Sequence, residues 1–240
     1  MAKGVAVSVI IPTLNEERYI ESCLRSLKNQ DYADKLEIIV ADGGSKDETR
    51  KIAEKYADKV LLVKRRGISV GRNEGAKIAK GEILIFIDAD TIVMPNTIRE
   101  LIKAFANKAV VGATCFLMPD SMENRDLILY FIYNNFIRRS LKTKSGHMTG
   151  ACTACRKYSF DIIDGYNESL KALEDFDFSE RLGKLGKLVF TDKTFVVVST
   201  RRIASWGRVK SVKKYMGLYL NRLTKGRLFN GIAYRQVRKI

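Results

Sequence analysis

Several residue types that would mark other protein classes are scarce in this chain. Its 240 residues include 3 prolines, 1 histidine and 2 glutamines. So little proline excludes a proline-rich linker protein, and 46% apolar with 29% charged residues exclude a disordered chain. Scarce glutamine beside plentiful lysine and glutamate favours a thermophilic source. A chain of this length is expected to form one domain with a sizeable core, or one domain with an appendage.

Long hydrophobic runs are also missing. Uncharged stretches such as Ala109–Pro119 fall well short of the roughly 20 residues that a membrane-spanning helix needs. The apolar run Val5–Ile11 has the length of a signal-peptide core, but Pro12 and the acidic pair Glu16-Glu17 follow it without a small-residue cleavage pattern. We therefore expect residues 5–11 to form a first β-strand.

Cysteine and histidine are too few for a structural zinc site. Cys152 and Cys155 form one C-x-x-C, but such a site needs a second pair of ligands, and His147 is the only histidine. We interpret the four cysteines as small buried residues in a reducing compartment.

Acidic residues are absent from the end of the chain. Lys and Arg outnumber Asp and Glu by 43 to 27, a net charge of +16, yet residues 201–240 hold twelve of the basic residues and no acid. The first 200 residues therefore carry only +4, and the tail carries +12. Such a tail favours a phosphate-bearing partner: a nucleic acid, an anionic membrane or a phosphorylated substrate. Because aromatic residues are interleaved with the cations, we expect a cytoplasmic protein held peripherally on the inner face of the membrane.

Apolar β-rich segments alternate with segments of helical periodicity along the first 110 residues. This alternation predicts parallel βαβ units, in which the carboxyl ends of the strands share one edge, where open α/β sheets bind ligands. Strands are expected at 5–11, 36–41, 59–63 and 82–87, and helices after Asn15 and at 47–56, 69–80 and 96–106.

Three polar clusters end predicted strands at that edge, namely residues 13–16, 42–45 and 88–90. Asp88 and Asp90 follow a buried strand one residue apart, and such a pair forms a hard oxygen site for Mg²⁺ or Mn²⁺ that could bridge a diphosphate. The chain has neither G-x-G-x-x-G nor a Walker A motif, which argues against a dinucleotide dehydrogenase and a P-loop NTPase.

Another acidic group begins a predicted helix at 173–185. A helix dipole favours one acid in the first turn, but Glu174, Asp175 and Asp177 exceed what capping needs. One of these carboxylates could therefore serve as a general base towards an acceptor hydroxyl.

Three features keep alternative interpretations. Arg201 and Arg202 follow a predicted strand and are either a clamp for a diphosphate or a solvated basic face. His147 is either a structural residue or a contact to a metal or phosphate. The amphipathic stretch 126–141 is either core or an interfacial segment that lies on a bilayer.

Five motifs occur along the chain in this order: Ser8-Val9-Ile10-Ile11-Pro12-Thr13-Leu14-Asn15-Glu16, Asp42-Gly43-Gly44-Ser45, Gly71-Arg72-Asn73-Glu74-Gly75, Asp88-Ala89-Asp90, and Gly165 through Glu174-Asp175 to Gly183. Taken together and in this order, they resemble the motifs of family 2 glycosyltransferases of the GT-A fold. The match covers roughly residues 5–205, and it is specific for the superfamily rather than for the sugars. The usual G-G-F-D-E of that family reads Gly165-Tyr166-Asn167-Glu168 here, a mild departure in the acceptor loop.

The resemblance implies a role for each matching residue. Asp175 would be the catalytic base beside Glu174, and Asp90 would contact the metal, with Asp88 on the metal or the ribose. His147 is a further candidate metal contact. Donor-binding candidates are Pro12, Thr13, Glu16, Asp42 (towards the nucleobase), Gly71, Arg72, Asp88, Arg201 and Arg202.

The sequence thus predicts an α/β protein of the GT-A fold, with a mostly parallel sheet flanked by helices. Residues 1–115 would bind the nucleotide sugar, 116–204 the acceptor, and 205–240 would form a basic helical tail. The expected enzyme is an inverting, metal-dependent glycosyltransferase. It would use Mn²⁺ or Mg²⁺, a UDP- or GDP-type donor and a hydroxyl of a lipid-linked or surface-glycan acceptor.

Three other functions remain as alternatives. Within the same class, the product could be a polyprenyl-phosphate sugar or a small glycoside. A nucleic-acid-binding protein could use the basic aromatic tail, although the strand-end carboxylates would repel phosphates in the absence of a metal. A nucleotidyltransferase generally opens with a glycine-rich loop and a basic residue after the first strand, and the stretch 12–15 lacks it.

Overall fold

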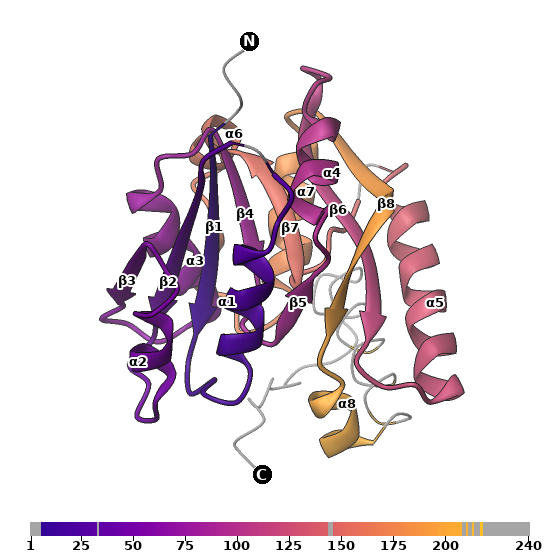
Figure 1. The fold of residues 1–240 in the computed structure, drawn as a ribbon. Coiled ribbons are helices and arrows are strands. Elements are labelled where there is room, and N and C mark those ends of the chain that lie inside the picture. Colours follow the sequence, from indigo (N-terminus) through magenta and orange to yellow (C-terminus); the bar gives the residue numbers. More distant parts are fainter. Residues whose placement is uncertain are drawn as a thin grey trace.

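The computed structural model describes residues 6–32, 34–143 and 146–207, together with positions 210, 213 and 217. Across these residues the chain forms one eight-stranded mixed sheet flanked by helices (Figure 1). Most of the predicted tail at 205–240 lies outside the described residues. The predicted division at residue 115 stays a prediction, and both proposed halves contribute strands to the same sheet.

The first half of the sheet consists of parallel strands, as the alternation predicts. Strand β1 lies between β2 and β4, and β3 pairs with the outer side of β2. Thr13 is opposite Asp42 in the β1–β2 register, so the two strand ends meet. The bounds are β1 (Val7–Thr13), β2 (Leu36–Asp42), β3 (Lys59–Leu62) and β4 (Ile83–Ile87).

In the second half of the sheet two strands, β7 and β5, run opposite to the others. β7 runs antiparallel between β4 and β6, β8 pairs parallel with β6, and the short β5 pairs antiparallel with β8. Six of the eight strands in the described residues therefore run the same way. β8 is one continuous strand, and its pairing with β6 contains an irregularity. The bounds are β5 (Thr91–Val93), β6 (Val110–Pro119), β7 (Cys152–Arg156) and β8 (Lys187–Val198).

The helices cover the sheet with apolar faces whose spacing follows the helical period. In α1, Ile20, Cys23, Leu24 and Leu27 are all buried, and their spacing places them on one face of the helix. The bounds are α1 (Ile20–Lys28), α2 (Thr49–Ala53), α3 (Ile68–Ile78), α4 (Thr97–Ala104), α5 (Asn124–Ser140), α6 (Lys157–Ile162), α7 (Glu174–Gly183) and α8 (Arg201–Trp206).

A glycine lets α3 pack closely on β1. A Cβ atom at Gly75 would lie 2.4 Å from Cγ2 of Ile10, which is far inside van der Waals contact. This close packing brings the Gly71–Gly75 segment under the carboxyl edge of the sheet. The four cysteines are free and buried, in agreement with their interpretation as small core residues.

The side chain of Asn134 joins helix α5 to strand β6 through the two hydrogen bonds that a neighbouring strand would make. The amide of Asn134 accepts from the backbone N–H of Leu117 at 2.9 Å and donates to its carbonyl at 2.8 Å. Ile137 is buried below it, and Tyr133 packs on the core. One face of the 126–141 stretch therefore packs in the core, which agrees with the first of the two interpretations given for this stretch. Among the described residues, no helix combines the length and the apolar character that crossing a bilayer requires.

Candidate functional site

The ends of β1 and β2 form a closed turn around Asp42. Its Oδ1 accepts from the backbone N–H groups of Gly44 at 2.9 Å and Ser45 at 2.8 Å, and the hydroxyl of Thr13 lies 3.4 Å from Oδ2. Gly44 has φ +87°, a conformation that glycine adopts without strain. Because Asp42 is fully buried, its carboxylate organises the turn in this structure, and the nucleobase contact stays a prediction.

Glu16, Asp90 and Arg201 form a second cluster at the same edge. The guanidinium of Arg201 contacts both carboxylate oxygens of Glu16 at 2.7 Å and Oδ2 of Asp90 at 2.9 Å. It also lies 4.4 Å from the centre of the Tyr19 ring, within cation–π range. The structure therefore brings together a predicted metal ligand and two predicted donor-binding residues.

Backbone hydrogen bonds hold Arg201 close to Asp90, although the two residues are more than a hundred positions apart in the sequence. Pairing of β5 with β8 continues into a hydrogen bond from Ser199 N–H to the carbonyl of Asp90 at 3.3 Å. Asp120 at the end of β6 accepts from both the N–H and the hydroxyl of Thr200, at 2.8 and 2.7 Å. These bonds fix the start of α8, and thus Arg201, beside the Asp88–Asp90 loop.

Arg72 is the centre of a third cluster. Its side chain is 1% exposed, and its two terminal nitrogens contact Asp88 Oδ1 at 3.0 Å, Glu174 Oε1 at 3.1 Å and the Gly150 carbonyl at 3.1 Å. The guanidinium lies 4.8 Å from the centre of the Tyr166 ring. A buried charge of this kind needs such partners. Arg72 thus joins the predicted metal site to the predicted acid pair, and a donor contact by Arg72 stays a prediction.

Asp175 is held in one orientation by two backbone donors. The N–H of Phe176 donates to Oδ1 at 2.9 Å and that of Gly150 to Oδ2 at 3.2 Å. Burial raises the pKa of Asp175, and Arg72 and these two donors oppose the rise. Burial also raises the pKa of Glu174, and the neighbouring Asp175 adds to the increase. Raised pKa values in a polar cluster are common among catalytic carboxylates.

The acid pair follows a residue in an uncommon backbone conformation. Leu173 has φ +58° and ψ +27°, a left-handed geometry that costs a non-glycine residue about 1–2 kcal/mol. It immediately precedes α7, whose first residue, Glu174, pairs with Arg72. Nothing in the sequence signals this conformation, because leucine rarely adopts it.

Asn73 is a site residue to which the sequence assigns no role. Its Oδ1 accepts from the backbone N–H of Tyr166 at 2.8 Å, and its Nδ2 donates to the Tyr166 carbonyl at 2.8 Å and to Glu168 at 3.0 Å. Asn73 therefore clamps the Gly165–Glu168 motif onto α3. Its position inside the Gly71–Gly75 motif was the only available signal.

Asp88 and Asp90 have the chemistry that a magnesium or manganese ion prefers. Burial raises the pKa of both carboxyls, while Arg72 opposes the rise at Asp88 and Arg201 opposes it at Asp90. Each carboxylate thus already has a cation beside it, which is the charge balance that a bound metal would supply. One or two carboxylates with substrate phosphates are a usual Mg²⁺ ligand set.

His147 lies in a different environment from the two aspartates. Its buried ring stacks on Phe176 with centroids 3.4 Å apart, and Nε2 lies 3.0 Å from the hydroxyl of Tyr133. In the part of the chain that the structure describes, no three His, Cys, Asp or Glu side chains gather into a metal-binding group. The metal contact of His147 stays a prediction.

The remaining predicted donor residues lie around these clusters. A Cβ atom at Gly71 would lie 3.1 Å from Cβ of Pro12, so these two positions pack together below the site. Arg202 is exposed, and its charge lowers the pKa of Asp88 and Asp90 against the larger effect of burial.

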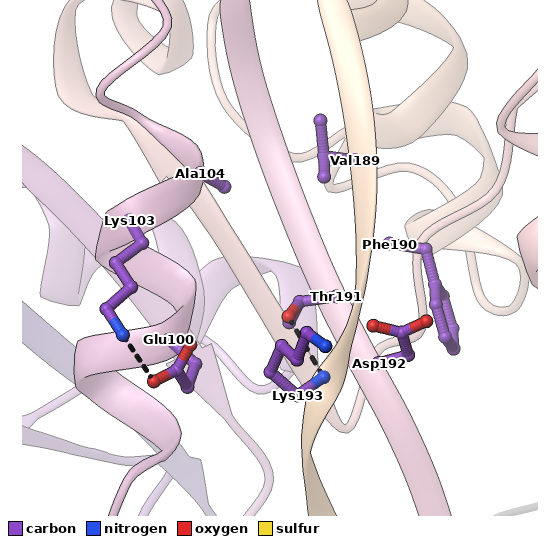
Figure 2. Close-up of a pocket in the computed structure, with 8 residues that line it drawn as sticks. All are labelled: Glu100, Lys103, Ala104, Val189, Phe190, Thr191, Asp192 and Lys193. Atoms are coloured by element: carbon purple, nitrogen blue, oxygen red, sulfur yellow. Dashed lines mark hydrogen bonds and ion pairs between the residues drawn. The ribbon is translucent and has the colours of Figure 1, made fainter.

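A hollow between α4 and β8 lies apart from these clusters. Figure 2 shows Lys103 turned towards Glu100, 2.8 Å away, on one side, and Thr191 and Lys193 on the other. None of its lining residues is a predicted site residue, so we assign the hollow no part in the site.

The mixed sheet flanked by helices is the fold of the GT-A glycosyltransferases. The mannosyltransferase PcManGT of Pyrobaculum calidifontis, solved with GDP-Man and Mn²⁺, superposes with a TM-score of 0.66 at 27% identity, over 80% of this chain and 56% of that one. Staphylococcus aureus TarS 1-349, solved with UDP-GlcNAc, gives a TM-score of 0.66 at 24% identity over 81% and 58%, a likeness of fold alone.

The model of Glycosyl transferase family 2 matches residues 8–163, and the chain belongs to that family. This confirms the family resemblance drawn from the motifs. In sequence, 100 residues are 37% identical to the poly(ribitol-phosphate) beta-N-acetylglucosaminyltransferase TarS of Staphylococcus aureus, over 39% of this chain and 18% of that protein. Matches to the first curated relatives span only 18% to 30% of the relatives' length.

Proposed function

We propose that the chain is an inverting glycosyltransferase that moves a sugar from a UDP- or GDP-type donor to an acceptor hydroxyl. The observation that carries this proposal is the cluster around Arg72, where Asp88 and Glu174 share one buried guanidinium and Asp175 follows Glu174 directly. The donor side and the base side of a displacement would then lie on either side of one fixed charge. Family membership and the nucleotide sugars bound to PcManGT and TarS support the donor class.

The donor would bind along the carboxyl edge of the sheet. Thr13 and Asp42 would border the nucleoside, and Glu16 would lie beside the diphosphate. Arg201 and Arg202 would contact the phosphates, for which a guanidinium offers paired donors. Asp90 and Asp88 would hold Mn²⁺ or Mg²⁺, which supplies charge neutralisation of the leaving diphosphate when bound.

Asp175 would act as the general base. Its carboxylate takes the proton of the acceptor hydroxyl while that oxygen bonds to the anomeric carbon. The bond from the anomeric carbon to the diphosphate oxygen breaks, and the nucleoside diphosphate leaves with the bonding electrons. Attack from the face opposite the leaving group inverts the configuration. Backbone donors at Gly150 and Phe176 support this role, because they fix the carboxylate before the acceptor arrives.

The acceptor is proposed to be lipid-linked or part of a surface glycan. The support is the basic tail, which holds twelve cations and no acid after residue 200 and suits an anionic membrane on the cytoplasmic side. A chain held at that surface would meet a lipid-linked hydroxyl at high local concentration.

A thermal-shift screen of nucleotide sugars with Mn²⁺ or Mg²⁺ tests the proposal. A ligand that binds only the folded state raises the melting temperature. At a ligand concentration of a hundred times its Kd, the free energy of unfolding rises by about 2.7 kcal/mol. We expect one diphosphate-sugar type to stabilise the chain and chelator to cancel the effect. No shift with any nucleotide sugar would overturn the proposal.

A further inference from the structure

The outer face of α5 carries large apolar side chains that nothing in the described chain covers. Ile128, Phe131 and Ile132 are 59%, 65% and 60% exposed, and Met122, just before the helix, is 87% exposed. Spacings of three and four residues place the three helical positions on one face. We call these four residues the α5 ridge. Apolar side chains grouped in this way mark an interaction surface, unlike scattered exposed residues.

Arginines flank the α5 ridge at both ends. Arg125 and Arg139 are exposed one turn before Ile128 and two turns after Ile132, and helical spacing places both on the same stripe as those residues. Arg138 is exposed beside them and pairs with Asp192 at 3.0 Å. An apolar centre between arginines matches the boundary of an anionic bilayer, where long basic side chains reach the headgroups while apolar ones enter the acyl region. Isoleucine offers nothing to the phosphates of a nucleic acid.

We propose that the α5 ridge is a membrane-contact face that lies flat in the headgroup region of an anionic bilayer. The helix has 17 residues and would lie along the surface for about 25 Å. This resolves the two interpretations of residues 126–141, since one face of the helix is core and the other is interfacial. The inference deepens the proposed function, because it rests on the lipid-linked acceptor for its purpose.

The position of α5 places that face beside the proposed active site. Strand β6 ends at Pro119, Asp120 caps α8 through Thr200, and α5 begins only a few residues later at Asn124. In Figure 1 the start of α5 and α8 both lie at the carboxyl edge of the sheet, at the bottom of the view. A bilayer against the ridge would therefore present an acceptor headgroup on the side of the sheet where Arg201 and Asp90 meet.

Site-specific fluorescence tests the proposal on the full chain. All four native cysteines are buried, so Phe131→Cys provides a single accessible thiol for an environment-sensitive NBD label. Ile162→Cys on α6 is the matched control, because Ile162 is a similarly exposed apolar residue, at 61%. Vesicles of phosphatidylcholine with phosphatidylglycerol should shift the emission of the label at 131 to the blue, and spin-labelled lipid should quench it. The label at 162 should show neither effect.

A binding measurement gives a second readout. Phe131→Ser with Ile132→Ser should weaken partitioning into the same vesicles by about tenfold or more, since each side chain contributes buried apolar area at the interface. The matched control is Tyr158→Ser with Ile162→Ser on α6, which should leave partitioning unchanged. An equal loss in both double variants would overturn the proposal.

Other occupants of the ridge would give different results. If the label at 131 is already blue-shifted without vesicles, a second copy or the chain's own tail covers the ridge and the proposal is wrong. Dilution would then reveal the copy, and truncation after residue 207 would reveal the tail. Thermal shifts by nucleotide sugars need no vesicles. Stabilisation by a donor in a chain whose label at 131 ignores vesicles would overturn the membrane face alone.

Discussion

Nη2 of Arg201 lies 2.9 Å from Oδ2 of Asp90, where the carboxylate would otherwise be open to a divalent ion. The same guanidinium holds both oxygens of Glu16, so one cation balances two acids from different loops. Arg201 and a metal would therefore compete for Asp90. A diphosphate would ease the competition, because it offers the guanidinium a new anionic partner.

The first prediction concerns this competition. Arg201→Ala should increase the affinity for Mn²⁺ in the absence of nucleotide by about two- to fivefold. This factor corresponds to the free energy of a partly exposed ion pair. It should also weaken binding of the nucleoside diphosphate, since a phosphate contact is lost. Titration calorimetry measures both affinities.

Arg65→Ala is the control for charge alone, because Arg65 pairs with Glu168 outside this cluster. It should leave the Mn²⁺ affinity unchanged. Weaker metal binding in Arg201→Ala would contradict competition and would instead indicate that Arg201 organises the metal site.

The second prediction concerns the proposed base. Asp175→Asn should lower the transfer rate by about 10²- to 10⁴-fold, the usual contribution of a general base. Donor binding should change little, because Asp175 is assigned to the acceptor hydroxyl. The measurements are kcat for transfer and a thermal shift with the donor. Asp177→Asn is the matched control two residues further along α7, since Asp177 pairs with Arg181 at 2.7 Å. A near-normal rate in Asp175→Asn would rule out its role.

The third prediction is a loss of activity in mild acid. Burial raises the pKa of Asp175, so this carboxyl takes up a proton at a higher pH than an ordinary aspartate does. A base must be unprotonated, and kcat/KM should therefore fall as the pH drops, with the acid limb above the ordinary aspartate pKa of about 3.9. The pH–rate profile measures the limb.

Protonation of the metal ligands needs a separate control, because burial also raises the pKa of Asp88 and Asp90. Raising the metal concentration at each pH would shift a limb that reports metal binding to lower pH and would leave a limb due to the base in place. An acid limb at or below the ordinary aspartate pKa would count against a buried base.

The parts of the fold set by local chemistry could be predicted, and those set by distant pairing could not. β1, β2 and β4 are apolar runs closed by polar clusters, so the shared edge and its acids follow from the sequence. The antiparallel insertion of β7 between β4 and β6 has no local signal, because its short C-T-A-C-R stretch gains its partners only in the folded sheet. The three-residue β5 also lacks a local signal. Its pairing with β8 brings Arg201, which follows β8, close to Asp90, which precedes β5.

Within the site, residue types were easier to predict than their partners. The acids Asp88 and Glu174 were expected at one site, but not that a single buried arginine would join them. Arg72 was a donor-binding candidate through the family resemblance, and its burial is not visible in the sequence. Leu173 gave no signal, since its left-handed backbone is imposed by the packing around α7.

The last prediction concerns the clamp made by Asn73. Asn73→Ala should lower the free energy of unfolding by about 2 kcal/mol or more, because the buried N–H and C=O of Tyr166 both lose their partner. Urea unfolding measures the change. Asn135→Ala is the matched control, since that exposed amide donates only to the Phe131 carbonyl one turn back. Its effect should stay within about 0.5 kcal/mol.

Asn73→Ala should also affect the candidate active site, because the ring centre of Tyr166 lies 4.8 Å from the guanidinium of Arg72. A displaced Tyr166 would loosen Arg72 and with it Glu174, so we expect transfer to weaken more than donor binding does. The comparison of kcat with the donor-induced thermal shift measures this split. A stability loss with unchanged kcat would mean that Asn73 supports the fold alone, and that the Gly165–Glu168 motif does not position the acid pair.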